Sequence, residues 1–292
     1  MKNLSATAHL VAMYRALESD RPNALFQDLF ARRLAGGEGA LMVEVLGNKQ
    51  QETSAMAIRT CVIDEMITHL VRSNRVNTVL NLAAGLDTRP YRLDLPASLR
   101  WIEVDLPDIL KHKEQNLKNE QPVCSIERVK LDLIDVGLRK ALFTQINASA
   151  NQVLVITEGL LSYLTEGQVA SLAADLRQQS NFHWWLFELA SPMVLKQAQK
   201  SDRQQRFDQY FANGKATFLF APDAGAEFFR PYGWKLTQFR SIWQEACRLK
   251  RQTDLVRFAG FPIRCFAKQY WQAITERSGF VLLERDFCTS ID

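Results

Sequence analysis

The chain lacks the features of several large protein classes. No apolar run among its 292 residues approaches the ~20 residues that cross a bilayer, so we expect no membrane-spanning helix. The amino terminus has no apolar stretch with a small-residue cleavage site, so we expect no signal peptide. The five cysteines form no CxxC pair and the four histidines stand alone. We therefore predict no disulfide framework and no metal site, as in a cytoplasmic protein with reduced thiols.

A large excess of one charge is also missing. The 36 basic and 32 acidic residues leave a net charge of +4, and the basic residues are scattered along the chain. Nucleic-acid binding usually needs a clustered basic face, so we predict neither a nucleic-acid nor a membrane partner. Hydrophobic residues make up 47% of the chain, enough for a large core. The length permits one large domain or two small ones.

The first part of the chain has a helical pattern. Apolar residues recur at three-and-four spacing through residues 10–17 and 25–34, and a longer helix is expected over 55–71. A loop is expected at Gly36 to Gly39, where three glycines lie close together.

The pattern then changes to short apolar runs that alternate with helical segments. The runs predict buried strands at residues 77–82, 100–104, 129–131, 152–156 and 183–189. Helices are expected over 108–119 and from the N-cap Thr165 to about residue 179. This alternation predicts an α/β fold with a mainly parallel sheet.

The last third is less regular. Residues 192–213 are polar and helical, and we interpret them as an insertion that lies over the sheet. Two helix-glycine-strand patterns follow: 228–233 leads into a strand at 234–240, and 270–279 leads into a strand at 280–286. Glycine is expected at both helix ends because it enters the left-handed conformation without a Cβ clash.

Acidic residues follow three of the expected strands. Asp105, Asp132 and Glu158 each stand at a strand's carboxyl end, where ligands bind in such sheets. A single acid in such a place is more often a loop residue or a helix cap. Three at equivalent strand ends indicate a shared polar ligand.

The turn after the first strand lacks the glycines of a dinucleotide site. It reads Ala83-Ala-Gly-Leu-Asp-Thr88 where a pyrophosphate-binding turn would read GxGxxG. A carboxylate at Asp87 would repel a pyrophosphate, which argues against a nicotinamide cofactor. S-adenosylmethionine fits better because it carries an amino group and a sulfonium and no phosphate.

The strand-end acids match the parts of that ligand. Asp105 stands 20 residues beyond Gly85 and can accept both ribose hydroxyls. Asp132 can accept from the adenine amino group while Leu133 packs on the ring. Glu158 would lie nearest the methionine end.

Four segments resemble the leucine carboxyl methyltransferase family, which includes bacterial O-methyltransferases associated with polyketide synthesis. The stretch Asn81-Leu-Ala-Ala-Gly-Leu-Asp-Thr-Arg-Pro-Tyr-Arg-Leu93 is similar to its signature. Arg15-Ala-Leu-Glu-Ser-Asp-Arg-Pro22 with Asp28 resembles its amino-terminal segment. Glu103-Val-Asp-Leu-Pro107 with Lys113 and Thr157-Glu-Gly-Leu-Leu-Ser-Tyr-Leu164 resemble its second-strand and fourth-strand motifs.

The resemblance implies roles for particular residues. Arg59 matches an arginine that contacts the carboxylate of S-adenosylmethionine, Gly85 the cofactor-loop glycine and Asp105 the ribose-binding acid. Ala83 departs from the family, many of whose members have glycine there. The expected cofactor contacts are Arg59, Ala83, Gly85, Asp87, Asp105, Leu106, Asp132, Leu133 and Glu158.

Several neighbouring residues keep two interpretations. Asp87 either binds the cofactor's amino group through water or caps the following helix. Arg89 and Arg92 either receive an acidic substrate or form buried bridges to Asp87 or Glu158. Tyr163 either lines the acceptor pocket or packs against neighbouring side chains.

Some aromatic side chains also have two interpretations. His183, beside two tryptophans, is favoured as a core or edge residue over a catalytic one. A second group could wall an acceptor site but is more often core: Phe218, Phe220, Phe228, Phe229, Tyr232 and Trp234.

The fold that these patterns and the resemblance imply is a class I methyltransferase fold, a seven-stranded, mainly parallel sheet with an antiparallel last strand. We expect one domain, with amino-terminal helices over 1–75, a cofactor-binding core over 76–190, and a helical lid and the last strands over 191–292.

The expected reaction is S-adenosylmethionine-dependent O-methylation of a carboxylate or hydroxyl on a small molecule or peptide. No strand-end histidine offers a base for a hydroxyl, which favours a carboxylate. Glu158, Tyr163 and Arg89 are the catalytic candidates. The alternatives are a nicotinamide-dependent oxidoreductase and a non-catalytic S-adenosylmethionine-binding protein.

Overall fold

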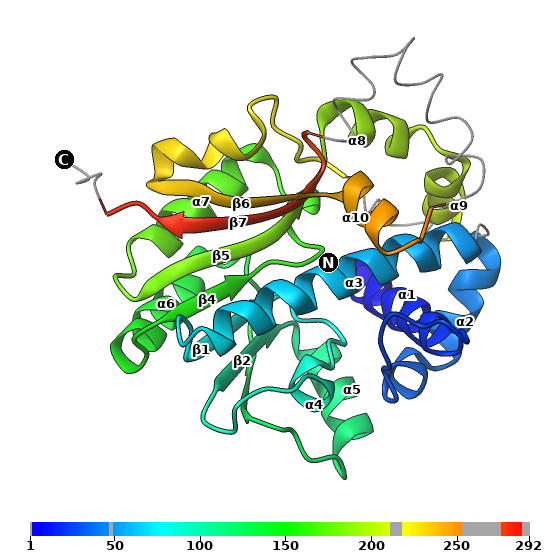
Figure 1. Ribbon diagram of the computed structural model, residues 1–292, viewed down its shortest axis with the longest axis horizontal. Coiled ribbons are helices and arrows are strands. Elements are labelled where there is room, and N and C mark those ends of the chain that lie inside the picture. The colour runs from blue at the N-terminus through cyan, green and yellow to red at the C-terminus, as the bar shows by residue number, and fades with distance from the viewer. Residues whose placement is uncertain (1, 47–48, 211–217, 253–275, 288–292) are drawn as a thin grey trace.

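The computed structural model describes residues 2–46, 49–210, 218–252 and 276–287. Its centre is one seven-stranded sheet in the order β3-β2-β1-β4-β5-β7-β6 (Figure 1). The strands are β1 (Thr78–Leu82), β2 (Arg100–Asp105), β3 (Ser125–Lys130), β4 (Val153–Ile156), β5 (Phe182–Leu189), β6 (Trp234–Ser241) and β7 (Gly279–Arg285). Strands β1 to β5 pair in parallel, and β7 runs antiparallel to both β5 and β6. The predicted fold class is confirmed.

Helices lie on both faces of this sheet and beyond the carboxyl ends of its strands. They are α1 (Lys2–Ser19), α2 (Ala31–Leu46), α3 (Lys49–Arg72), α4 (Arg89–Arg92), α5 (Pro107–Leu117), α6 (Val136–Ser149), α7 (Glu166–Arg177), α8 (Pro192–Gln199), α9 (Asp202–Tyr210) and α10 (Ile242–Arg248), with 3-10 turns η1 (Leu161–Tyr163) and η2 (Gly225–Tyr232). None of the helices in the described ranges is long and apolar enough to cross a membrane.

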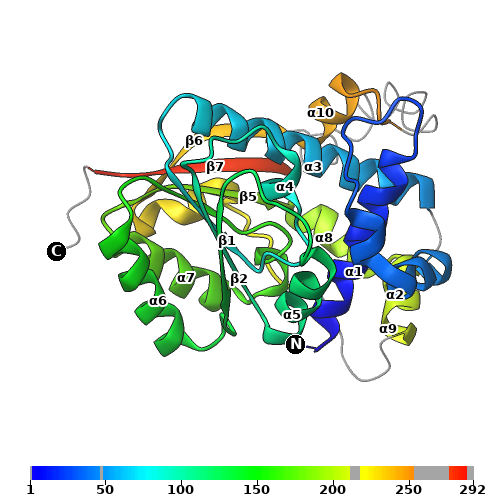
Figure 2. The ribbon, with the colours of Figure 1, turned by 90° about the horizontal axis from the view of Figure 1, so that it is seen from below.

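The strands divide their side chains between two cores. Alternate residues point to opposite faces, so Val79 packs with α3 while the next residue, Leu80, packs with α6 and α7. Figure 2 shows α3 on one side of the sheet and α6 and α7 on the other. This two-sided burial explains why the strands lack an alternating polar pattern: β1 and β4 are buried at every position.

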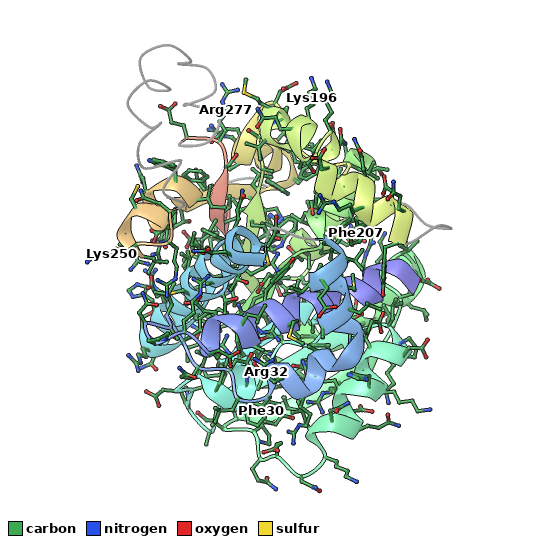
Figure 3. The ribbon with its side chains drawn as sticks, turned by 90° about the vertical axis from the view of Figure 1, so that its right-hand side faces the viewer. Phe30, Arg32, Lys196, Phe207, Lys250 and Arg277 are labelled. Carbon is green, nitrogen blue, oxygen red and sulfur yellow. The ribbon has the colours of Figure 1, made fainter. Side chains whose placement is uncertain are left out.

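A third apolar cluster lies beyond the carboxyl ends of the strands. It joins α1 and α2 to Leu86, which follows β1, and to Phe207 of α9 (Figure 3). Helices α1, α2, α8 and α9 gather at this end of the molecule (Figure 1). The predicted insertion at 192–213 therefore lies at the strand ends and not over a sheet face; residues 211–213 lie outside the described part.

Three sequence-based boundaries were wrong. The glycines at 36–39 do not form a loop, because only Gly36 leaves the helical conformation and α2 continues past it with a kink. The helix expected over 25–34 begins at Ala31, where the Asp28 carboxylate accepts the backbone N–H. Strand β3 ends at Lys130, so Asp132 lies in the following loop.

Two predicted signals at helix ends are confirmed. Thr165 caps α7, with a reciprocal capping box to Gln168, as predicted for an N-cap. Gly233 ends η2 in the left-handed conformation at φ 76°.

Gly279 was misread. It is the first residue of β7, and a Cβ there would lie 2.3 Å from the carbonyl oxygen of Arg240 on the neighbouring strand. A close approach of two backbones, and not a helix end, therefore requires this glycine. Residues 270–275 of the predicted preceding helix lie outside the described residues.

Gly233→Ala should lower the free energy of unfolding by about 2 kcal/mol, since a left-handed non-glycine residue costs about 1–2 kcal/mol. The new Cβ would also lie 2.3 Å from Nε of Arg177 and displace that side chain. Urea unfolding measures the change. The matched control is Gly37→Ala in α2, where a Cβ meets no atom within 4 Å; it should leave stability unchanged or raise it. Equal effects of the two substitutions would contradict the assignment.

Candidate active site

One cavity of about 970 Å³ lies at the carboxyl ends of the strands. Its walls come from the ends of β1, β2, β4 and β5, from the loop after β3, and from α1, α3, α8 and α9. Every residue that the sequence assigned to the site lines it: Arg59, Ala83, Gly85, Asp87, Arg89, Asp105, Leu106, Asp132, Leu133, Glu158 and Tyr163. The fold thus brings together side chains from five separate sequence segments, one on α3 and four at or after the ends of strands.

The loop after β1 is held by the carboxylate that ends β2. Asp105 accepts the backbone N–H groups of Gly85 and Leu106, each at 2.6 Å. Burial raises the pKa of Asp105 against the effect of these two hydrogen bonds. Since a carboxylate has about four lone-pair sites, it can still accept two hydroxyl hydrogens.

The same loop has two residues in the left-handed region. Gly85 has φ 52° and Ala83 has φ 56°. An alanine pays a steric cost there that glycine does not. This explains in physical terms why glycine is the more suitable residue at the position where the chain departs from the family pattern.

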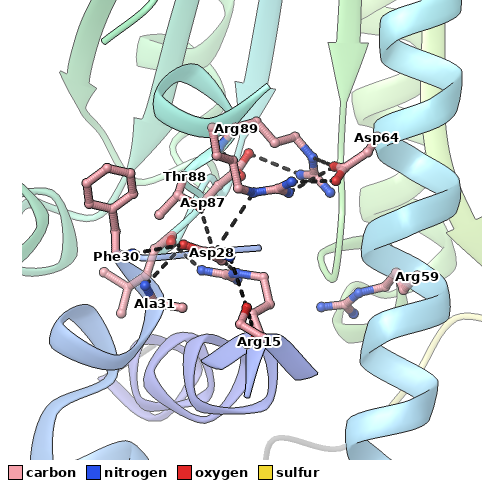
Figure 4. Close-up of polar contacts among 12 residues, drawn as sticks. Arg15, Asp28, Phe30, Ala31, Arg59, Asp64, Asp87, Thr88 and Arg89 are labelled. Atoms are coloured by element: carbon pink, nitrogen blue, oxygen red, sulfur yellow. Dashed lines mark hydrogen bonds and ion pairs between the residues drawn. The ribbon is translucent and has the colours of Figure 1, made fainter. Parts of the chain in front are cut away.

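Arg89 connects the ends of β1 and β4 to α3. Its guanidinium lies 2.6 Å from Asp64 and 3.1 Å from Asp87 (Figure 4). It also lies 2.7 Å from Glu158, and the Arg89 side chain is 3% exposed. Burial disfavours its charge, but these carboxylates raise its pKa well above the ordinary arginine value. Arg92 pairs with Asp64 at 2.5 Å. Arg89 therefore forms the buried bridges to Asp87 and Glu158 that the sequence left as one of two choices, whereas the partner of Arg92 is Asp64.

Asp87 performs the capping role proposed for it. Its Oδ1 accepts the N–H of Arg89, the first residue of α4, at 3.0 Å, and its Oδ2 accepts from the amide of Asn81 at 2.8 Å. Burial opposes its charge, yet Arg89 lowers the pKa of Asp87 well below the ordinary aspartate value. The residue also lines the cavity, so capping does not remove it from the site.

Glu158 lies between two arginines. Its Oε1 is 2.9 Å from Nε of Arg59, and its Oε2 is 2.7 Å from Nη1 of Arg89. Burial disfavours the charged form, but the two guanidinium groups hold the pKa of Glu158 below its ordinary value. The carboxylate stays ionised, and it fixes both arginines at the end of β4.

Glu188 is a cavity residue that the sequence analysis missed. It stands near the end of β5, accepts the N–H of Gly159 at 2.6 Å and lies 3.5 Å from Arg59. Burial raises the pKa of Glu188, against the lowering effect of Arg59. The signal was present, because an acid near the carboxyl end of a fifth parallel strand satisfies the rule that selected Asp105 and Glu158.

The amino-terminal helices are tied to the loop after β1 by a buried carboxylate. Asp28 pairs with Arg15 of α1 at 2.8 Å and accepts from the hydroxyl of Thr88 at 2.7 Å (Figure 4). Arg15 also donates to the carbonyl of Leu86 at 2.6 Å. The motif that resembled the family's amino-terminal segment thus positions α1 as a wall of the cavity.

Two further predicted residues, Asp132 and Tyr163, also line the cavity. Asp132 lines the cavity and accepts the N–H of Ile134 at 2.9 Å. Tyr163 lines it and packs on Phe218, with ring centroids 5.1 Å apart.

The expected aromatic wall is mostly core. Only Phe218 and Phe220 of that group line the cavity, while the others pack in the core beneath α7: Phe228, Phe229, Tyr232 and Trp234. His183 is half-buried beside Phe287, with ring centroids 5.8 Å apart, and does not line the cavity.

Arg89→Met should destabilise the protein by about 3–5 kcal/mol, because it leaves three buried carboxylates without their shared partner. Urea unfolding measures the loss. Arg72→Met is the matched control: that arginine is 63% exposed and pairs with Asp94 at the surface, so its removal should cost less than about 1 kcal/mol. A loss for Arg89→Met as small as the control's would show that the bridge is not structural.

Asp28 should make stability depend on pH in the acid range. Burial disfavours its charge, but Arg15, Arg92 and Thr88 hold its pKa below the ordinary value. A lowered folded-state pKa adds stability above the unfolded pKa of about 3.9, and this stability is lost as the pH falls through the folded pKa. The difference in unfolding free energy between wild type and Asp28→Asn should therefore shrink below about pH 4. The exposed Asp108→Asn is the control for the removal of one carboxylate.

Comparisons with known proteins agree with this architecture. A protein of Streptomyces coelicolor, provisionally named as an S-adenosyl-L-methionine-dependent methyltransferase, is 34% identical over 187 residues, which are 60% of this chain and 65% of that protein. A Rhodococcus jostii protein with the same provisional name is 36% identical over 175 residues, 56% of this chain and 58% of its own length. The chain thus matches about six tenths of the length of these relatives.

Two solved structures share the fold at low sequence identity. A DUF574-family protein from Streptomyces avermitilis is 12% identical, with a TM-score of 0.56, over 96% of this chain and 97% of its own. A protein from Thermobifida fusca, provisionally called a methyltransferase, is 15% identical, with a TM-score of 0.53, over 94% of each chain. A family model described as leucine carboxyl methyltransferase matches residues 8–177, more than half of the sequence. The chain therefore belongs to the leucine carboxyl methyltransferase family.

Proposed function

We propose that the protein is a methyltransferase that uses S-adenosylmethionine to methylate an oxygen atom of an acceptor. The observation that carries the proposal is the arrangement of carboxylates around one cavity: Asp105 ends β2, Glu158 follows β4, and the loop between them is built around Gly85. Family membership and the names of the relatives support the same cofactor.

The chemistry of the lining residues suits this cofactor. Asp105 has free lone pairs for ribose hydroxyls, and Leu106 and Leu133 offer apolar contacts to a purine ring. The described lining residues include six acidic and four basic side chains, an excess that favours a cationic ligand. Asp87 follows Leu86 in the loop, where a pyrophosphate-binding turn would present only backbone N–H groups.

Each part of the cavity has a separate task in the proposed reaction. S-adenosylmethionine supplies a methyl group already activated on a positive sulfonium. Arg59 and Glu158 position the methionine end, and Asp105 positions the ribose. Helices α1 and α9 contribute walls to the cavity beyond the strand ends. Alignment and desolvation supply much of the acceleration of a transfer to an oxygen nucleophile.

The two alternative functions make different demands on the same residues. A nicotinamide-dependent oxidoreductase needs a pyrophosphate next to the β1 loop, where Asp87 adds negative charge. A non-catalytic binding protein would bind the cofactor but show no turnover. The cytoplasmic location expected from the scattered cysteines stays a prediction.

Calorimetry with S-adenosylhomocysteine tests the proposal. Asp105→Ala should weaken binding roughly 10- to 100-fold, because hydrogen bonds to a charged group contribute about 1.5–3 kcal/mol. The matched control is Asp108→Ala, three residues further along and outside the cavity, which should bind as the wild type does. A melting curve for each variant shows that it is folded.

Equal affinities of wild type and Asp105→Ala would contradict the assignment of the ribose site. Tight binding of NAD in the same titration, with no binding of S-adenosylhomocysteine, would support the oxidoreductase instead.

A further inference from the structure

The arginines of the cavity are already paired with carboxylates of the protein. Among the described lining residues the basic side chains are all arginines, with neither lysine nor histidine. Arg15 pairs with Asp28 at 2.8 Å and Arg89 with Asp64 at 2.6 Å.

The other two arginines are paired as well. Arg59 lies 2.9 Å from Glu158, and Arg139 donates to Asp175 at 3.0 Å. An acceptor carboxylate would therefore enter a cavity with an excess of acidic side chains and would have to compete for a cation. The desolvation of such an anion would be poorly compensated. This geometry disfavours the carboxylate acceptor that the sequence alone had favoured.

Several elements contribute apolar side chains to the lining of the cavity. They include Leu189 of β5, Leu195 of α8, Phe207 of α9, and Phe218 and Phe220. Aliphatic and aromatic walls of this kind bind apolar molecules, with a few polar groups that fix the orientation.

Glu188 directly precedes one of these apolar residues, Leu189, in β5. In the sheet, β5 is three strand spacings from β2, so Glu188 stands roughly 14 Å from Asp105 across the cavity. Its Oε1 accepts from Gly159 and faces Arg59, while its Oε2 has no hydrogen-bond partner among the described residues. Rotation of the terminal carboxylate is soft, so either oxygen can face the cavity.

We propose that Glu188 accepts the proton of a hydroxyl group on an uncharged, apolar acceptor and selects such acceptors over carboxylates. This deepens the proposed function and rests on it. The acceptor oxygen forms its new bond to the methyl carbon as the bond from that carbon to sulfur breaks, and the electron pair stays on sulfur as a neutral thioether. The hydroxyl proton passes to the Glu188 carboxylate and then to water. The raised pKa of the buried carboxyl makes it a stronger proton acceptor when ionised.

A matched pair of probes tests the selectivity. 2-Naphthol and 2-naphthoate share a ring system and differ in the group that would face Glu188. With saturating S-adenosylhomocysteine at pH 7, 2-naphthol should bind at least about tenfold more tightly than 2-naphthoate in calorimetry. Preferential binding of 2-naphthoate, or no binding of either probe, would overturn the proposal.

Substitution of Glu188 tests whether that side chain causes the preference. Glu188→Gln keeps an oxygen that can accept from Gly159 but removes the negative charge. It should weaken 2-naphthol about tenfold and strengthen 2-naphthoate, so that the preference disappears. The control Glu284→Gln, on the adjacent strand β7 and outside the cavity, should keep the wild-type preference. A preference that survives Glu188→Gln would refute the role.

Methyl transfer to 2-naphthol gives the catalytic readout. The wild-type rate should rise with pH as Glu188 ionises, whereas Glu188→Gln should be slower by about 100-fold or more with a flat profile. Equal pH profiles would overturn the proton-acceptor role. The binding of S-adenosylhomocysteine itself is measured first: its absence would refute the proposed function, whereas its presence with a carboxylate preference would refute only this inference.

Discussion

The pairing of buried charges at the carboxyl ends of β1 and β4 is the constraint on which the site depends. Arg89 holds three carboxylates from three different elements, and Glu158 shares its other oxygen with Arg59. An unpaired charged group would not stay ionised at this buried position, because burial disfavours the charged form. Their mutual compensation keeps the groups ionised and fixes the loops that surround the cavity.

The sheet and the strand-end acids were within reach of sequence reasoning. Buried parallel strands have unbroken apolar runs such as Val79 and Leu80, and acids that follow them must meet at one edge. Glu188 was missed only because the rule was not extended to the fifth strand. Gly279 was misread because a close approach to Arg240 from another strand is invisible in the local sequence.

The sequence suggested two partners of Arg89, Asp87 and Glu158, but not the partners that come from distant elements. Arg89 and Asp87 are two residues apart in the sequence. Asp64, another carboxylate that pairs with Arg89, comes from a helix 25 residues away. The same holds for Asp28 and Thr88, which are 60 residues apart. A local sequence pattern predicts helices and strands, whereas these ion pairs and hydrogen bonds depend on how the helices and strands pack together.

The walls of the cavity come from both ends of the described chain, from Thr7 in α1 to Phe280 in β7. Contacts between residues so far apart in sequence form only after much of the chain has been ordered. A partly folded species without β5 or α1 would lack complete walls. Ligand binding would then stabilise only the fully assembled sheet, so that occupancy of the cavity and completion of folding are thermodynamically linked.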